Sequence, residues 1–140
     1  RGCIGYVSPS KPLWITVKEV AALAAVRDNR FPPVTAAELG ELTYEISVLS
    51  PMRRMLDAKA IQVGRHGLVV KRGEQEGLLL PQVATEQGWD APAFLEQTCR
   101  KAGLAPGAWK DPDTDVFLFS ALVFGEHAGG SPVSSVKRAR

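Results

Sequence analysis

Helical and strand-like spacings of apolar residues follow one another along this chain. Residues 13–27 place apolar side chains near the helical period and are rich in alanine, which predicts a helix that packs closely on a sheet. Thr35 and Glu38 match a capping box and predict a short helix that ends at Gly40. Residues 90–102 predict another helix, because a proline suits its first turn and a glycine follows its end.

The remaining apolar segments have the length and composition of strands. We predict strands over residues 1–7, 42–49, 68–72, 77–81 and 116–124, and a helical turn within 55–61. Residues 68–72 and 77–81 flank a glycine-bounded turn and predict a hairpin. Leu78–Leu80 and Val116–Phe124 are apolar on both faces, so we expect two buried strands of one sheet. The fold class is α+β: a mainly antiparallel or mixed sheet with helices packed against it.

The second predicted strand carries a polar face. Tyr44 and Ile46 alternate with Glu45 and Ser47, so the first pair is expected in the core and the second on the opposite face, at the border of a polar groove. A carboxylate buried without a partner is costly, and we therefore expect Glu45 to accept a hydrogen bond from Arg65 or from a backbone amide.

Composition limits the class of protein. With 140 residues, 45% of them hydrophobic and 23% charged, the chain suits one globular domain. We assign this domain to residues 1–127 and a disordered basic tail to residues 128–140. A net charge of +2 with scattered basic residues is typical of surface charge rather than of a nucleic-acid binder. No apolar run reaches the roughly 20 residues of a membrane-spanning helix.

The chain has two cysteines, Cys3 and Cys99, without the spacing of a disulfide framework, and this indicates a cytoplasmic protein. Cys3 lies between glycines of the first predicted strand, which leaves two alternatives open: a reactive thiol or ligand attachment point, or a small buried apolar residue. Cys99 shares a predicted helix with apolar neighbours and is expected in the core.

His66 is a candidate base for Cys3, with Glu45 to orient it. The alternative, which we favour, is that Arg65 and His66 hold the hairpin through hydrogen bonds to carbonyl groups. No metal site is predicted, because the cysteines and histidines lack ligand spacing, and no cofactor is indicated. The Gly64-x-x-Gly67 pair precedes a strand rather than a helix, which argues against a phosphate-binding loop.

Several motifs in a fixed order resemble the AMMECR domain, also known as protein A of the AmmeMemoRadiSam system. The motifs are Arg1-Gly2-Cys3-Ile4-Gly5, Arg30-Phe31-Pro32-Pro33, Glu45-Ile46-Ser47-Val48-Leu49-Ser50-Pro51, Val63-Gly64-Arg65-His66-Gly67-Leu68 and Gly77-Leu78-Leu79-Leu80-Pro81-Gln82-Val83. Matches continue through Gly88-Trp89-Asp90 and residues 94–104, so the resemblance covers residues 1–126. Each motif alone is weak, and their joint order is specific.

The resemblance implies an α/β domain of two parts that is often encoded beside, or fused to, a Memo-type protein and a radical S-adenosylmethionine protein. Such proteins are therefore the expected partners. Family members normally carry a strand and a helix before the first motif, so the resemblance implies that this part of the domain is absent here. The family has no established activity, and no catalytic residue is inherited.

Two main functional hypotheses follow. The first is a module that binds a small molecule or a protein partner, in a groove lined by Cys3, Glu45, Ser47, Arg65, His66 and Gln82. The second is a thiol-dependent enzyme with Cys3 as nucleophile, and a depressed thiol pKa would favour it. The binding module leads because the catalytic set is incomplete. Nucleic-acid binding is third, with support only from Arg53, Arg54, Arg65, Lys71 and Arg72.

Overall fold

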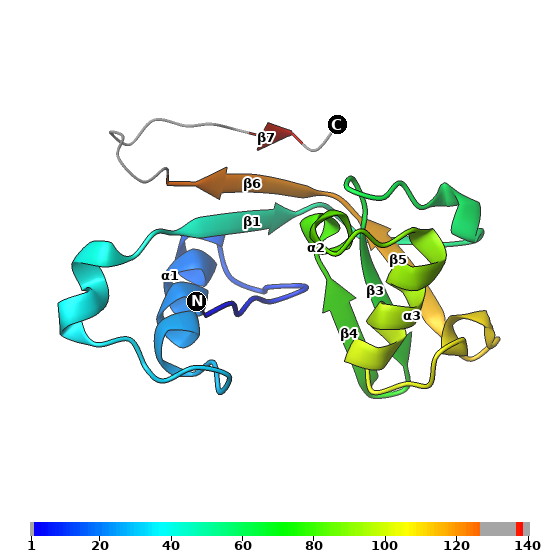
Figure 1. The fold of residues 1–140 in the computed structure, drawn as a ribbon, viewed down its shortest axis with the longest axis horizontal. Coiled ribbons are helices and arrows are strands. Elements are labelled where there is room, and N and C mark those ends of the chain that lie inside the picture. Colours follow the sequence, from blue (N-terminus) through cyan, green and yellow to red (C-terminus); the bar gives the residue numbers. More distant parts are fainter. Residues whose placement is uncertain (1, 127–136, 139–140) are drawn as a thin grey trace. The chain divides into compact units, whose positions relative to one another are not determined.

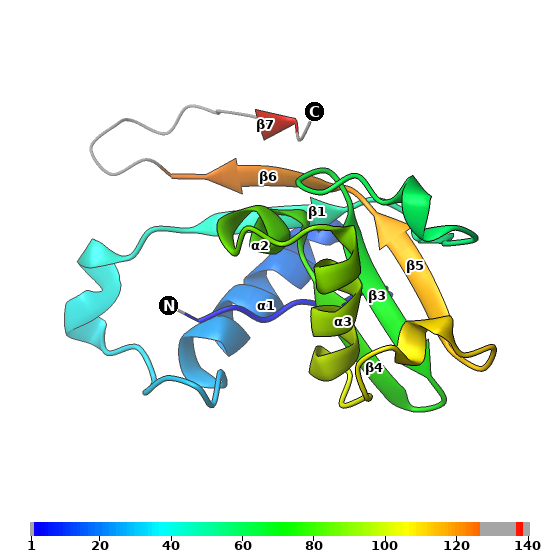
Figure 2. The ribbon, with the colours of Figure 1, turned by 45° about the vertical axis from the view of Figure 1, so that its right-hand side comes forward.

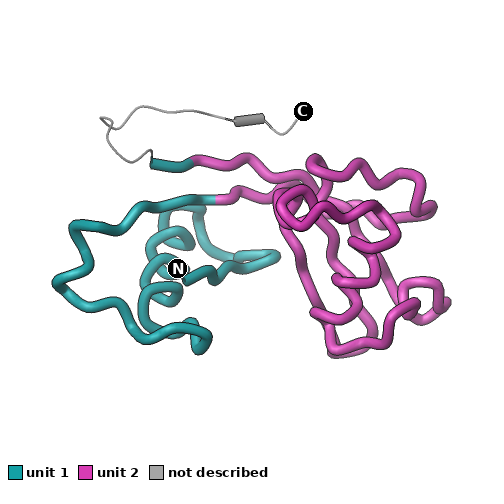
Figure 3. Tube along the Cα trace, viewed as in Figure 1, with its two compact units in different colours: residues 1–46, 125–134 teal, residues 47–124, 135–140 magenta. Residues whose placement is uncertain are grey.

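The computed structural model describes residues 2–126 and 137–138 and divides the chain into two compact units (Figures 1 and 3). The first unit comprises residues 1–46 and 125–134, and the second comprises residues 47–124 and 135–140. The elements, in chain order, are α1 (Leu13–Val26), η1 (Ala36–Glu41), β1 (Glu45–Leu49), β2 (Arg53–Arg54), η2 (Ala58–Ala60), β3 (Gly67–Arg72), β4 (Gln75–Leu79), α2 (Pro81–Glu86), α3 (Ala91–Lys101), η3 (Ala108–Lys110), β5 (Asp115–Phe119), β6 (Ala121–Gly125) and β7 (Lys137–Arg138). Helices and antiparallel sheets confirm the α+β class.

A four-stranded antiparallel sheet of order β2-β5-β3-β4 forms the centre of the second unit (Figure 2). The predicted hairpin is confirmed: β3 and β4 pair from Leu68 opposite Leu79 to Arg72 opposite Gln75, across a two-residue turn at Gly73 and Glu74. This turn is shorter than the predicted loop, because Gln75 already belongs to the strand. The sheet therefore has two inner strands, β5 and β3, and two edges.

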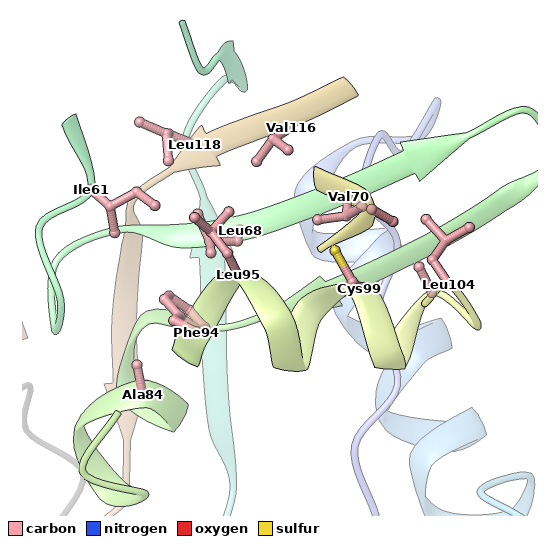
Figure 4. Close-up of a cluster of buried hydrophobic side chains, with 12 residues drawn as sticks. Ile61, Leu68, Val70, Ala84, Phe94, Leu95, Cys99, Leu104, Val116 and Leu118 are labelled. Atoms are coloured by element: carbon pink, nitrogen blue, oxygen red, sulfur yellow. The ribbon is translucent and has the colours of Figure 1, made fainter. Parts of the chain in front are cut away.

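Helix α3 covers one face of this sheet and supplies much of the core. Figure 4 shows Leu95 and Cys99 on α3 directed toward Leu68 and Val70 on β3. The Asp90 side chain accepts a hydrogen bond from the Ala93 N–H at 2.9 Å and so begins the helix as predicted. The helix approaches β4 so closely that a Cβ at Gly77 would lie 2.4 Å from the Ala102 nitrogen. Only a glycine fits at that position.

The predicted strand 116–124 is two strands in two sheets, and the prediction of one continuous strand was wrong. Val116–Phe119 lies in β5, whereas β6 belongs to a sheet of order β1-β6-β7. The break is at Ser120, which exchanges hydrogen bonds with Ser50: the Ser50 N–H donates to the Ser120 carbonyl at 2.8 Å, and the Ser50 Oγ accepts from the Ser120 N–H at 2.9 Å. Leu78 and Leu79 share the four-stranded sheet with β5, as expected, but they are only half-buried, and Leu80 precedes α2.

The first unit contains α1 and η1, both close to their predicted bounds, and the capping box of Thr35 and Glu38 is present. Two predictions for this part were wrong. Residues 2–7 form no strand, because the Cys3 N–H bonds to a side chain rather than to a neighbouring strand. Tyr44 and Ile46 are exposed, so the face that they share is not a core face.

Most of the predicted tail lies outside the described residues. Within it, Lys137 and Arg138 form β7, which pairs antiparallel with β6 at Val123 and Leu122. Among the residues that the structure describes, no helix combines the length and the apolar character that crossing a membrane requires.

Candidate functional site

The polar centre of the first unit is Asp28, a buried carboxylate just after α1. Its Oδ2 accepts from the Cys3 N–H at 2.9 Å and from Arg30 Nη2 at 2.6 Å, and its Oδ1 accepts from Arg30 Nε at 2.9 Å. The Arg30 backbone N–H donates to the same Oδ1 at 3.2 Å. The Asp28 carboxylate thus binds both the backbone of Cys3 and the side chain of Arg30, which donates to it from two nitrogens. We call Cys3, Asp28, Arg30 and Phe31 the Asp28 corner.

The electrostatics of this corner follow from its hydrogen bonds. The bond from the Arg30 side chain, and next the bond from the Cys3 N–H, hold the pKa of Asp28 well below its ordinary value. The pKa of Arg30 is raised chiefly by its hydrogen bond to Asp28 and by the charge of that carboxylate.

The corner presents three kinds of chemistry at the surface. Cys3 is exposed, and so are Arg30 and Phe31, with the Arg30 guanidinium 5.4 Å from the centre of the Phe31 ring. Beside Cys3, a Cβ at Gly2 would lie 1.9 Å from the Ala24 carbonyl oxygen, so this stretch lies directly on the last turns of α1. An exposed thiol, a cation held by Asp28 and an exposed aromatic ring therefore belong to one short stretch of surface chemistry in this unit.

Glu45 and Ser47 are the predicted groove residues of β1, and Glu45 lacks the expected hydrogen bond among the described residues. Glu45 is exposed, and none of the hydrogen bonds or ion pairs among the described residues involves its carboxylate. The predicted donor is therefore not found there. Ser47 is half-buried on the same strand. Glu45 belongs to the first unit with Cys3, whereas Ser47 belongs to the second unit with the other predicted groove residues, Arg65, His66 and Gln82.

His66 is buried, and its Nδ1 accepts a hydrogen bond from the Gln62 backbone N–H at 3.2 Å. Burial lowers the pKa of His66, and the positive charges of Arg65 and Arg53 lower it further. A neutral imidazole has one nitrogen lone pair, and here the Gln62 N–H occupies it. This geometry favours the structural alternative over a general base, and a catalytic role for His66 stays a prediction.

A side-chain hydrogen bond and two glycines determine the conformation of the turn that carries Arg65 and His66. The Arg65 Nη1 donates to the Gln62 Oε1 at 3.1 Å. Gly64 has a positive φ of 83°, and a Cβ at Gly67 would lie 2.2 Å from the Phe119 ring. Gly64 is therefore required by its backbone conformation, and Gly67 is required because a side chain there would clash with Phe119. Gln82 lies on α2 and is half-buried.

The basic residues that supported nucleic-acid binding are partly neutralised. Arg54 pairs with Asp115, and Lys71 pairs with Glu76 at 3.9 Å. Arg72 pairs with Asp111 and Asp113 and donates from Nε to Thr114 Oγ1 at 2.8 Å. Within residues 2–126 and 137–138, no three histidine, cysteine or acidic side chains gather as a metal site.

Asp28 is the residue that sequence reasoning missed. Its only signal was the Asp28-Asn29-Arg30 spacing, in which an acid stands two residues before a base at the end of a predicted helix. Arg30 and Phe31 were noted only as part of a motif. The bond to Cys3 joins residues that are 25 positions apart, and no local pattern indicates it.

Comparison with known proteins agrees with the motifs. The AMMECR1 family model matches residues 1–124. Protein TK0174 of Thermococcus kodakarensis is 50% identical over 138 residues, which cover 95% of this chain and 67% of that protein. Protein NEQ441 of Nanoarchaeum equitans is 44% identical over 132 residues, which cover 90% of this chain and 73% of that protein.

A solved structure is similar as well. The crystal structure of the uncharacterized protein PH0010 from Pyrococcus horikoshii superposes with a TM-score of 0.87 at 46% identity, over 90% of this chain. The chain spans 64% of the length of that crystal chain. On the match of the family model and on these relatives, the chain belongs to the AMMECR1 family.

Proposed function

We propose that this chain is a binding module and that the Asp28 corner is its contact site. The observation that supports the proposal is the fixed exposure of Cys3, Arg30 and Phe31 around one buried carboxylate. Arg30 uses Nε and Nη2 on Asp28, which leaves its Nη1 for an acceptor on a ligand. Phe31 adds an apolar surface beside it, which suits a partner that carries both an acidic and an apolar group.

The family resemblance identifies the first partners to test, a Memo-type protein and a radical S-adenosylmethionine protein. Isothermal titration of the purified chain with each of them, and a thermal-shift screen of small carboxylates and phosphates, test the proposal. Saturable binding that weakens about tenfold or more in Phe31→Ser supports it. Val63→Ser is the matched control, because Val63 is an equally exposed apolar residue of the second unit.

Two results contradict the proposal. One is binding that Phe31→Ser and Cys3→Ser leave unchanged while Val63→Ser abolishes it. The other is the absence of any ligand in both assays. Each variant is first shown to keep the melting temperature of the original chain, so that a loss of binding is not a loss of fold.

The exposure of Cys3, whose backbone N–H bonds to the same carboxylate as Arg30, favours thiol chemistry as the second candidate function. In that case the Cys3 thiolate attacks an activated acyl group, expels its leaving group and forms a thioester that water then hydrolyses. A burst of leaving group that is equal in amount to the protein, and absent in Cys3→Ser, is the expected signature. Steady release without a burst, unchanged in Cys3→Ser, contradicts it.

A further inference from the structure

Residues 50–66 of the second unit carry an excess of positive charge, and we call them the basic segment. Their only carboxylate is Asp57, which caps η2 by accepting a hydrogen bond from the Lys59 backbone N–H at 2.9 Å. The four cations of the segment are Arg53, Arg54, Lys59 and Arg65. Only Arg54 has an ion-pair partner among the described residues, namely Asp115. Three exposed cations of the segment therefore lack a countercharge there.

Arg53 and Arg65 lie at the same end of the four-stranded sheet. In the register of this sheet, Arg53 on β2 lies opposite Leu118 on β5, and Leu118 lies opposite Leu68 on β3. Two strand spacings, about 10 Å, thus separate Arg53 from Leu68. Arg65 precedes Leu68 by three residues, in the turn that leads into β3. Two long side chains extend over such a span, so their guanidinium groups can contact one ligand.

The buried His66 holds the basic segment together. Its Nδ1 accepts from the Gln62 backbone N–H, its backbone N–H donates to the Gln62 carbonyl at 2.9 Å, and its imidazole also bonds to the Ala60 backbone. After burial itself, the positive charges of Arg65 and Arg53 lower the pKa of His66, so both guanidinium charges act on one imidazole. The bond from Arg65 Nη1 to Gln62 Oε1 holds this guanidinium by one nitrogen and leaves the others for a ligand.

We propose that Arg53 and Arg65 bind a phosphate group between them, on a soluble phosphate ester or on a lipid headgroup. Two guanidinium groups without a carboxylate repel each other, and a doubly charged anion removes this repulsion. The paired N–H groups of arginine also match the oxygens of phosphate. A glycine-rich phosphate loop works differently, because it contacts the anion through backbone N–H groups. The site lies in the second unit and goes beyond the function proposed for the Asp28 corner.

An NMR titration of the labelled chain with sodium phosphate tests the proposal, with sodium chloride keeping the ionic strength constant. Saturable shifts are expected for the amides of residues 53–66. Arg53→Gln and Arg65→Gln should each weaken binding at least about tenfold, because each removes a hydrogen-bonded charge. Arg100→Gln is the matched control: Arg100 is an exposed cation of the same unit and forms no ion pair among the described residues. This control should bind as the original chain does.

His66 provides a second measurement. Sulfate is the probe, because it stays doubly charged over the range in which histidine titrates. Bound sulfate offsets the charges of Arg65 and Arg53, so the pKa of the His66 ring, followed by NMR, should be higher with sulfate than with chloride at equal ionic strength. Arg53→Gln should make this rise smaller, and Arg100→Gln should leave it unchanged.

Sedimentation with phosphatidylcholine vesicles that contain phosphatidic acid separates the two sources of phosphate. Co-sedimentation that Arg53→Gln reduces, and that pure phosphatidylcholine does not support, assigns a headgroup, whereas binding in solution alone assigns a soluble ester. The proposal is overturned if neither phosphate nor the vesicles bind, if the shifts spread over both units, or if Arg53→Gln behaves as Arg100→Gln does. Each of these results leaves binding at the Asp28 corner untouched, so the two proposals fail separately.

Discussion

The two cysteines differ in their exposure to solvent. Cys3 is exposed, whereas Cys99 lies on the buried face of α3 in the core, and burial raises the pKa of its thiol. We therefore predict that iodoacetamide labels Cys3 and leaves Cys99 unmodified in the folded protein. Peptide mass spectrometry with and without denaturant measures this. Equal labelling of both residues without denaturant would contradict the buried position of Cys99.

His66 makes stability depend on pH. Its folded pKa lies below the ordinary value of 6.5, so the unfolded chain takes up a proton first as the pH falls. The stabilisation is therefore complete only well above pH 6.5, and it is lost progressively as the pH falls through 6.5 toward the folded pKa. We predict that the free energy of unfolding decreases in urea titrations as the pH falls from about 7.5 toward the folded pKa of His66.

His66→Gln is the matching variant, because glutamine does not titrate in this range. It should be less stable than the original chain at neutral pH and should lose less stability on acidification. A pH dependence that is identical in the two proteins would assign the effect to another group.

At the level of single residues, the sequence indicates side-chain chemistry but not what surrounds each side chain. Cys3 was selected from its glycine neighbours, and it does lie at an exposed surface. Asp28 was missed because its role depends on tertiary structure: a buried carboxylate next to a helix end meets a backbone N–H from a distant segment. Glu45 was selected because of the alternation along its strand. Alternation predicts which face of the sheet a side chain occupies, but not whether other residues pack on that face.

At the scale of elements, the approach of α3 to β4 depends on Gly77. A methyl group at this position meets the backbone of Ala102, which cannot rotate away as a side chain can. We predict that Gly77→Ala lowers the free energy of unfolding by about 1–3 kcal/mol, measured by denaturant titration. Gly40→Ala is the control, because no atom lies within 4 Å of a Cβ there. Equal stability of the two variants would contradict the close packing.

Helix ends and the hairpin could be predicted because local chemistry specifies them. The spacing of Thr35 and Glu38 indicated the capping box that is present, and the proline and glycine around residues 90–102 indicated α3, which Asp90 caps. The boundary between β5 and β6 could not be predicted in this way. Residues 116–124 are apolar except for Ser120, and such a segment predicts one strand. The strand ends at Ser120 because this residue forms hydrogen bonds with Ser50, which is distant in the sequence.

At the scale of the molecule, the two units differ in how much apolar surface they bury. The core cluster lies entirely in the second unit, whereas the buried residues of the described first unit are Thr16 and Asp28. The first unit also holds most of the exposed large apolar side chains, namely Tyr6, Leu13, Trp14, Val26, Phe31, Leu39, Tyr44 and Ile46. Local stability should therefore differ between the units.

We predict that the backbone amides of α1 exchange with deuterium faster than those of α3. Helix α3 packs on a sheet through fully buried residues, and α1 has no buried apolar residue. Hydrogen–deuterium exchange followed by mass spectrometry measures both helices in one experiment. Protection of α1 equal to that of α3 would contradict the difference in burial.

The hydrogen-bonded pair of Ser50 and Ser120 has a consequence for modularity. The chain enters the four-stranded sheet just after Ser50 and leaves it at Ser120, and the two residues are joined by a 2.8 Å hydrogen bond. Every member of the core cluster lies between them in the sequence. Residues 50–120 therefore have adjacent ends and contain the whole core cluster, as an inserted domain does. We therefore expect residues 50–120 to keep their fold when they are excised or inserted into a host loop.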